Sequence, residues 1–256
     1  MTTWLTPEGT VNRLYADMLN QTHLLIAGMT GAGKSTVVQG IIHTALFDSP
    51  AVNQFILIDP KKVALIKYKS LPHTIAYACE NDTMIAALEK AVEIMNERYN
   101  VMQAQEIEDY EGTHIYVIID ELAHLMLNVK KQAAPLIQSL AQLGRAARIH
   151  VIAATQHPLT DVIPTCIKVN FDAKVGLRTE CAQHSRNIIH ETGCELLPKF
   201  GKCWYVTPKY HSIQTVTRIP DEERLAIIAY WKSDECIVKP AKAQPKRRGF
   251  LAALFG

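Results

Sequence analysis

A short glycine-rich segment near the amino end holds the residues most suited to chemistry. It reads Gly28-Met29-Thr30-Gly31-Ala32-Gly33-Lys34-Ser35-Thr36 and fits the pattern GxxxxGK[ST], between an apolar run and a helical pattern. Glycines let the backbone turn its N–H groups toward phosphate oxygens, and the following helix adds a partial positive charge. Lys34 can reach the β- and γ-phosphates, and Ser35 can ligate Mg²⁺. The segment therefore predicts a nucleoside triphosphate site with Mg²⁺.

An acidic pair follows a second apolar run, over residues 114–120. The run ends in Asp120, which can complete the Mg²⁺ shell from the carboxyl edge of a strand, facing Ser35. Glu121 comes next and is suited to orienting or deprotonating the water that attacks the γ-phosphate. Kinases of small molecules need no base for water. The pair therefore favours an ATP hydrolase that converts the energy into motion.

A third run, over residues 149–155, ends in polar residues as well. Gln156 follows it and is predicted to bond the γ-phosphate or the attacking water, reporting hydrolysis to the next element. The alternative, a strand that merely ends in polar side chains, stays open for these residues taken alone.

These residues require strands to carry them to a common edge. The apolar runs are short and unbroken, which is typical of strands buried on both faces of a parallel sheet. Helical patterns alternate with them at 82–102, where Asp82 is the expected N-cap, at 132–147, and from 219 onward. We expect one three-layer α/β domain with a mainly parallel central sheet. Its strands are predicted at 23–28, 54–59, 114–120, 149–155, 173–178 and 202–206.

Composition excludes several classes of protein. The chain has 256 residues, of which 48% are hydrophobic and 20% are charged, a globular composition. A net charge of +2 does not by itself indicate nucleic-acid binding. Six cysteines without a CxxC pair favour reduced thiols in the cytoplasm. No apolar run approaches the ~18 residues of a membrane span, so we expect a soluble protein that reaches a membrane only through a partner.

The expected organisation has three parts. Residues 1–22 form a lead-in segment, residues 23–238 form the ATPase domain, and residues 239–256 form a basic, flexible tail. The alternative for the tail is contact with DNA, an acidic membrane surface or a partner protein.

Seven segments occur in one order along the chain: HLLIAGMTGAGKS, FILIDPKKVAL, LPHTI, EIMNERYNVM, VIIDELAHLM, LIQSLAQLGRAARIHVIAATQHP and SRNIIHETG. In this order they resemble the FtsK/SpoIIIE-type DNA translocases. The resemblance implies a RecA-like P-loop ATPase that forms a homo-oligomeric ring, usually a hexamer, around double-stranded DNA. ATP then lies at subunit boundaries, and a neighbour contributes an arginine, by position Arg145. Lys61 is a candidate to reach a neighbour's nucleotide.

The chain departs from the family pattern at several positions. Arg148 stands where the family has glycine, which leaves open whether Arg145 or Arg148 reaches the phosphate. His157 replaces an arginine, and His184 and His190 stand where acids are commoner. The family's motors also carry a further subdomain before the glycine-rich phosphate-binding segment, here called the cradle, and often a winged-helix domain after the ATPase domain. We therefore expect a reduced motor that depends on another protein, such as a membrane or mobile-element component.

Basic residues supply the candidate DNA contacts, and the sequence is compatible with more than one transported substrate. Lys168 and Arg178 are the candidate DNA contacts, with Lys130 and Lys131 as weaker ones, and ordinary surface charges are an equally good interpretation of all four. The leading function is an ATP-driven motor on double-stranded DNA, for chromosome segregation or transfer of a plasmid or mobile element. The alternatives are an ATPase that drives polypeptide secretion and a nucleotide-dependent scaffold of a DNA-transfer machine.

Overall fold

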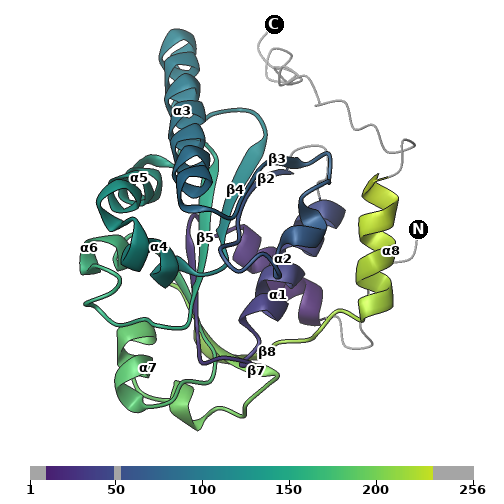
Figure 1. Ribbon diagram of the computed structural model, residues 1–256, viewed down its shortest axis with the longest axis vertical. Helices are drawn as coiled ribbons and strands as arrows, with labels where there is room; N and C mark the ends of the chain where they lie inside the picture. Colours follow the sequence, from purple (N-terminus) through teal and green to yellow (C-terminus); the bar gives the residue numbers. More distant parts are fainter. Residues whose placement is uncertain (1–9, 49–52, 233–256) are drawn as a thin grey trace, which may run out of the picture.

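A computed structural model, which describes residues 10–48 and 53–232, contains one eight-stranded sheet (Figure 1). The strand order is β3-β2-β4-β5-β1-β6-β7-β8. The first six strands in this order are parallel, and β7 and β8 add to the sheet antiparallel. The strands are β1 (Leu24–Ala27), β2 (Asn53–Ile58), β3 (Thr74–Ala78), β4 (His114–Ile119), β5 (Ile149–Thr155), β6 (Ala173–Gly176), β7 (Lys202–Val206) and β8 (His211–Thr215).

Helices cover both faces of the sheet and make three layers, as Figure 1 shows. One face carries α1 (Thr10–Leu19), α2 (Lys34–Asp48) and α8 (Asp221–Lys232). The other carries α3 (Asn81–Gln105), α4 (Leu122–Asn128), α5 (Lys130–Leu143) and the short α6 (Thr165–Lys168). Near β6 lies α7 (Ala182–Ile189), and the 3-10 helices are Ile66–Tyr68 and Cys194–Leu196.

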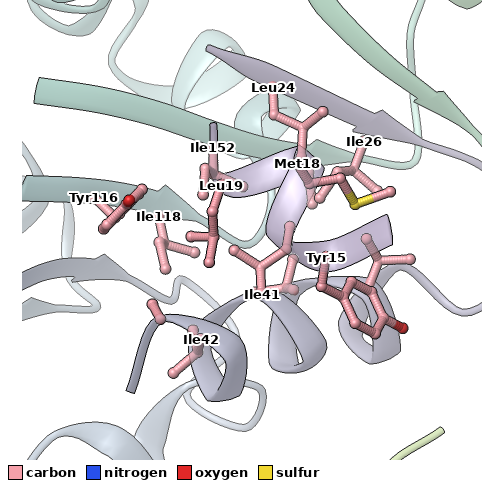
Figure 2. Packing of buried hydrophobic residues seen from close by; sticks show 14 of the residues in the cluster. Tyr15, Met18, Leu19, Leu24, Ile26, Ile41, Ile42, Tyr116, Ile118 and Ile152 are labelled. Atoms are coloured by element: carbon pink, nitrogen blue, oxygen red, sulfur yellow. The ribbon is translucent and has the colours of Figure 1, made fainter. Parts of the chain in front are cut away.

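Successive residues of the central strands pack into opposite layers. On β1, Leu24 and Ile26 contact the α1 and α2 side, whereas Leu25 contacts the α3 to α5 side. Figure 2 shows the first of these layers, where Tyr15 of α1 and Ile41 of α2 meet the strand side chains. Full burial of each such side chain contributes about 1.5–3 kcal/mol. Burial on both faces explains why the strands read as unbroken apolar runs.

The predicted fold class is confirmed, and the six predicted strands are all present. Two strands were not predicted, β3 and β8, which form the two edges of the sheet. The Asp82 N-cap is wrong, because α3 begins at Asn81 and its cap is Glu80, whose N–H donates to the Thr83 hydroxyl at 3.0 Å. The second helix also ends earlier than predicted, at Leu143.

The expected division of the chain stays a prediction. Helix α1 falls within the lead-in segment 1–22, yet Leu14, Tyr15 and Met18 are buried in the same core cluster as α2. The expected tail, 239–256, lies outside the described residues. Among residues 10–48 and 53–232, no helix combines the length and the apolar character that a bilayer crossing requires.

Candidate active site

The carboxyl ends of four parallel strands bring three of the predicted positions, and Asp59, to one side of the sheet. Gly28 follows β1, Asp59 follows β2, Asp120 follows β4 and Gln156 follows β5. The N–H of Gly28 donates to the carbonyl of Thr155 at 3.3 Å, so the glycine-rich segment continues from the sheet itself. This side of the sheet is where α/β sheets place their ligands.

The glycine-rich segment forms a tight turn into α2. Gly31 and Gly33 have φ of 75° and 107°, values that residues with a Cβ rarely adopt. Lys34 is the first residue of α2, and its Nζ donates to the carbonyls of Gly28 at 2.7 Å and Met29 at 3.0 Å. Burial lowers the pKa of Lys34 to about 8, against the attraction of Glu121. A bound phosphate would oppose this lowering, because an anion favours the charged ammonium.

Glu121 is held at the junction of three elements. Its Oε1 accepts hydrogen bonds from the Thr155 hydroxyl and from the N–H of Gln156, both at 3.0 Å. Its Oε2 pairs with Lys61 Nζ at 3.3 Å. The side chain of Glu121 is 7% exposed and that of Lys61 is 45% exposed. The carboxylate is therefore fixed at the end of β4, with one oxygen bound to β5 and the other to the loop after β2.

Gln156 connects this carboxylate to the glycine-rich segment. The hydroxyl of Thr30 donates to Gln156 Oε1 at 2.7 Å, and the backbone of Gln156 donates to Glu121. A change at Thr30 on nucleotide binding would thus reach Glu121 through a single residue.

Asp120 lies beside a second buried carboxylate. Asp59 is fully buried; its Oδ2 accepts the N–H of Leu65 at 2.9 Å, and its Oδ1 has no hydrogen-bond partner within the described part of the chain. Burial and the charge of Asp59 raise the pKa of Asp120 to about 6. A site that disfavours its own carboxylate charge fits a cation. Oxygen donors of this kind suit Mg²⁺, and Ser35 would supply a hydroxyl from the first turn of α2.

The two candidate arginines lie just before β5, at the amino ends of the parallel strands and so on the side of the sheet opposite the glycine-rich segment. Arg145 is exposed. Arg148 is half-buried, has φ of 53°, and donates from Nη1 to the carbonyl of Gly112 at 3.1 Å. Glycine adopts this left-handed conformation more readily than arginine, which agrees with the glycine that the family resemblance leads one to expect here. Because β5 has 7 residues, its two ends are about 20 Å apart. Neither arginine can therefore reach the glycine-rich segment of its own chain, which lies at the carboxyl ends of the strands.

The candidate DNA contacts are both engaged within the chain. Lys168 is buried, and its Nζ donates to the carbonyl of Pro158 and to the hydroxyl of Thr160, each at 3.1 Å. The guanidinium of Arg178 donates to the carbonyl of Leu197. As DNA contacts they stay predictions that require these bonds to break, whereas Lys130 and Lys131, ranked lower from sequence, are exposed at the start of α5.

A small cavity borders the glycine-rich segment in the single chain. A cavity of about 40 Å³ beside the cradle is far below the several hundred Å³ of an enclosed ligand site. A larger hollow of about 750 Å³ lies along α3 and Leu136, away from this cavity. The small cavity is lined by Gly28, Met29, Thr30, Gln156, His157, Pro158, Thr179, Glu180 and His184.

Sequence reasoning missed two features of this site. It did not assign a role to Asp59, and it considered Lys61 only for a neighbour's nucleotide, whereas Lys61 pairs with Glu121 of its own chain. Asp59 directly follows β2, so the strand-end rule that selected Asp120 would also have selected it, whereas Lys61 lies two residues further along the loop.

Comparison with known proteins identifies the relatives of this chain. The model of the FtsK/SpoIIIE family matches residues 1–116 and 111–159, more than half of the chain. The chain belongs to the FtsK/SpoIIIE family. This confirms the resemblance seen in the sequence. DNA translocase FtsK of Staphylococcus epidermidis is 37% identical over 218 residues, which cover 77% of this chain and 27% of that protein. DNA translocase FtsK of Lactococcus lactis subsp. cremoris is 35% identical over 202 residues, 71% of this chain and 27% of that protein. The chain thus spans about a quarter of the length of these FtsK relatives.

Solved structures share the fold of this FtsK/SpoIIIE member. The conjugation coupling protein TcpA of pCW3, a monomer with ATPγS, superposes with a TM-score of 0.72 at 22% identity, covering 84% of this chain and 66% of that one. The type VII secretion ATPase EccC of Thermomonospora curvata gives a TM-score of 0.72 at 20% identity, covering 83% and 28%. At these identities the likeness establishes the α/β ATPase fold.

Proposed function

We propose that this chain is an ATP-driven motor that moves double-stranded DNA through a ring of identical subunits. The placement of Glu121 carries the proposal. Its carboxylate is buried beside the phosphate cradle and bonded to Gln156, the arrangement that a hydrolase needs to direct a water at a terminal phosphate. The FtsK relatives support DNA as the substrate.

The residues of the chain divide the work of hydrolysis. The N–H groups of Gly28 and Met29 are bonded to the carbonyls of Thr155 and Arg178, so the backbone N–H groups from Thr30 to Thr36 and the ammonium of Lys34 bind the phosphates. Lys34 then leaves the two carbonyls that hold it in the single chain. Glu121 orients the attacking water and accepts its proton, and Gln156 contacts the terminal phosphate. Ser35 and Asp120 would hold Mg²⁺, which neutralises charge on the phosphate oxygens when bound.

A neighbouring subunit completes this site with Arg145. The small cavity beside the glycine-rich segment lies at the carboxyl ends of the strands and the exposed Arg145 lies at their amino ends, so one subunit can present its arginine to the site of the next. Arg148 is the poorer candidate because its guanidinium is bonded to Gly112. An arginine supplied in trans is worth about 10³–10⁵ in rate, so hydrolysis would depend on assembly. A hexameric ring in the cytoplasm, recruited by a membrane or mobile-element partner, fits the family.

Transport of a polypeptide is the second candidate, because EccC superposes as well as TcpA does. ATP turnover measured with duplex DNA, with peptide and with neither, beside a measurement of oligomer size, separates the two. We expect duplex DNA to stimulate turnover with a steep salt dependence. Stimulation by peptide alone would replace the DNA proposal, and turnover equal to that of Lys34→Ala would indicate a scaffold.

A further inference from the structure

The segment 143–148 leads from the last residue of α5 to β5 and carries Arg145, and hydrogen bonds to its backbone carbonyls fix it in place. Each of its six carbonyl groups accepts a hydrogen bond. The carbonyl of Leu143 accepts from the hydroxyl of Tyr99, that of Gly144 from the N–H of Ile149, and that of Arg145 from the N–H of Arg148. The carbonyl of Ala146 accepts from the N–H of Tyr110, that of Ala147 from Nη1 of Arg98, and that of Arg148 from both the N–H of Ile115 and Nη1 of Arg98.

Two adjacent residues of α3 supply the side-chain bonds. Arg98 Nη1 donates to the carbonyl of Ala147 at 2.7 Å and to that of Arg148 at 3.3 Å, and its Nη2 donates to the Thr113 hydroxyl at 3.0 Å. The hydroxyl of Tyr99 donates to the carbonyl of Leu143 at 2.7 Å. Helices α3 and α5 pack side by side (Figure 1), so α3 holds the segment 143–148 at both of its ends.

Arg98 is itself a fixed group. Its side chain is buried, and its guanidinium lies over the ring of Tyr110, with Cζ 4.5 Å from the ring centre. Burial lowers the pKa of Arg98. A cation is costly to bury, and within residues 10–48 and 53–232 its partners are two carbonyls, the Thr113 hydroxyl and the Tyr110 ring, with no carboxylate among them. A buried, fixed guanidinium of this kind can hold the backbone carbonyls of Ala147 and Arg148 in one position.

The side chain of Arg145 contrasts with this fixed backbone. It is exposed and makes no hydrogen bond or ion pair with any residue that the structure describes. We propose that Arg98 and Tyr99 are positioning residues that hold the segment 143–148 so that it presents Arg145 to the ATP site of a neighbouring copy. This inference rests on the proposed function, in which Arg145 acts in trans.

The geometry also sets the expected size of the effect. An arginine that stabilises a transition state must be placed within fractions of an ångström, and a misplacement of about 1 Å can cost about 10²-fold in rate. Arg98→Lys keeps the charge, but a single ammonium lacks the planar fork that reaches the two carbonyls and Thr113 together. We expect the neighbour's hydrolysis rate to fall by roughly tenfold to a hundredfold in this variant.

Mixed oligomers test the inference. A Lys34→Ala subunit has no working ATP site but keeps Arg145, and an Arg145→Ala subunit keeps its site but lacks the arginine. Mixing the two should restore ATP turnover that neither has alone. Arg98→Lys placed in the Lys34→Ala subunit should then abolish most of the restored turnover, whereas the same change in the Arg145→Ala subunit should leave it unchanged.

The outcomes separate the two levels of the proposal. Equal loss from both placements, or no loss from either, would overturn the positioning role. No restoration by the unmodified pair would contradict the trans arginine of the proposed function itself, and the positioning role with it. Tyr99→Phe removes one hydroxyl from an unchanged ring, and should show the same donor-only loss, at smaller size, if Arg98→Lys proves unstable. Lys90→Met, an exposed residue of the same helix, is the matched control and should have no effect in either subunit.

Discussion

Replacing Asp120 by asparagine is expected to stabilise the nucleotide-free protein while destroying its activity. The pKa of Asp120 is raised from 3.8 to about 6, first by burial and then by the charge of Asp59. The folded state therefore holds the proton at a pH where the unfolded chain has lost it. Stability contributed by this group is complete below pH 4 and is lost as the pH rises through 6. A pKa difference of about 2 corresponds to about 3 kcal/mol at pH 7.

Urea unfolding with EDTA and without nucleotide measures this effect. At pH 7 we expect the midpoint of Asp120→Asn to lie roughly 1 M above that of the native chain, since the dependence on urea is a few kcal/mol per M. The gap should close as the pH falls toward 4. Glu97→Gln, an exposed carboxylate on α3, should produce no such gap. An Asp120→Asn protein that is less stable than the native one at pH 7, or a gap independent of pH, would refute the reasoning.

Three further predictions follow from the site and the core. Glu121→Gln should bind ATP and assemble but turn over at least about 10²-fold more slowly, because the base is lost; native-like turnover would remove Glu121 from that role. Lys34→Ala should lose ATP binding, measured by a fluorescent ATP analogue, and unchanged affinity would contradict the cradle assignment. His23 and His43 are buried, and burial lowers the pKa of each to about 4 from 6.5. Their neutral forms stabilise the folded chain above pH 6.5, and we expect each histidine to cost about 2 kcal/mol of stability by pH 5. Urea midpoints of the Asp120→Asn protein, which lacks the opposing change at Asp120, that are equal at pH 7.5 and 5 would exclude this.

The central strands and the cradle could be predicted because their signals are local. Strands such as β5 are buried on both faces and so read as continuous apolar runs, and the phosphate-binding segment needs its glycines and Lys34 at fixed spacing. The edge strands could not be predicted in this way. β3 is only partly buried along most of its length, and β8 alternates between exposed and half-buried residues, so neither presents an apolar run.

Contacts between segments far apart in the chain also could not be predicted from the sequence. The turn after α5 is bonded to α3, because Tyr99 donates to the carbonyl of Leu143 and Arg98 donates to those of Ala147 and Arg148. The pairing of Lys61 with Glu121 depends on β2 and β4 being neighbours in the sheet, an order that strand patterns do not contain.

The proposal that this chain pumps duplex DNA is tested most directly by displacement of a third strand from a linear duplex that carries a short triplex at one end. We expect the native oligomer to release the third strand in proportion to ATP consumed, and Glu121→Gln to bind the duplex without releasing it. ATP turnover on the duplex with no release of the third strand would contradict a DNA-translocating motor.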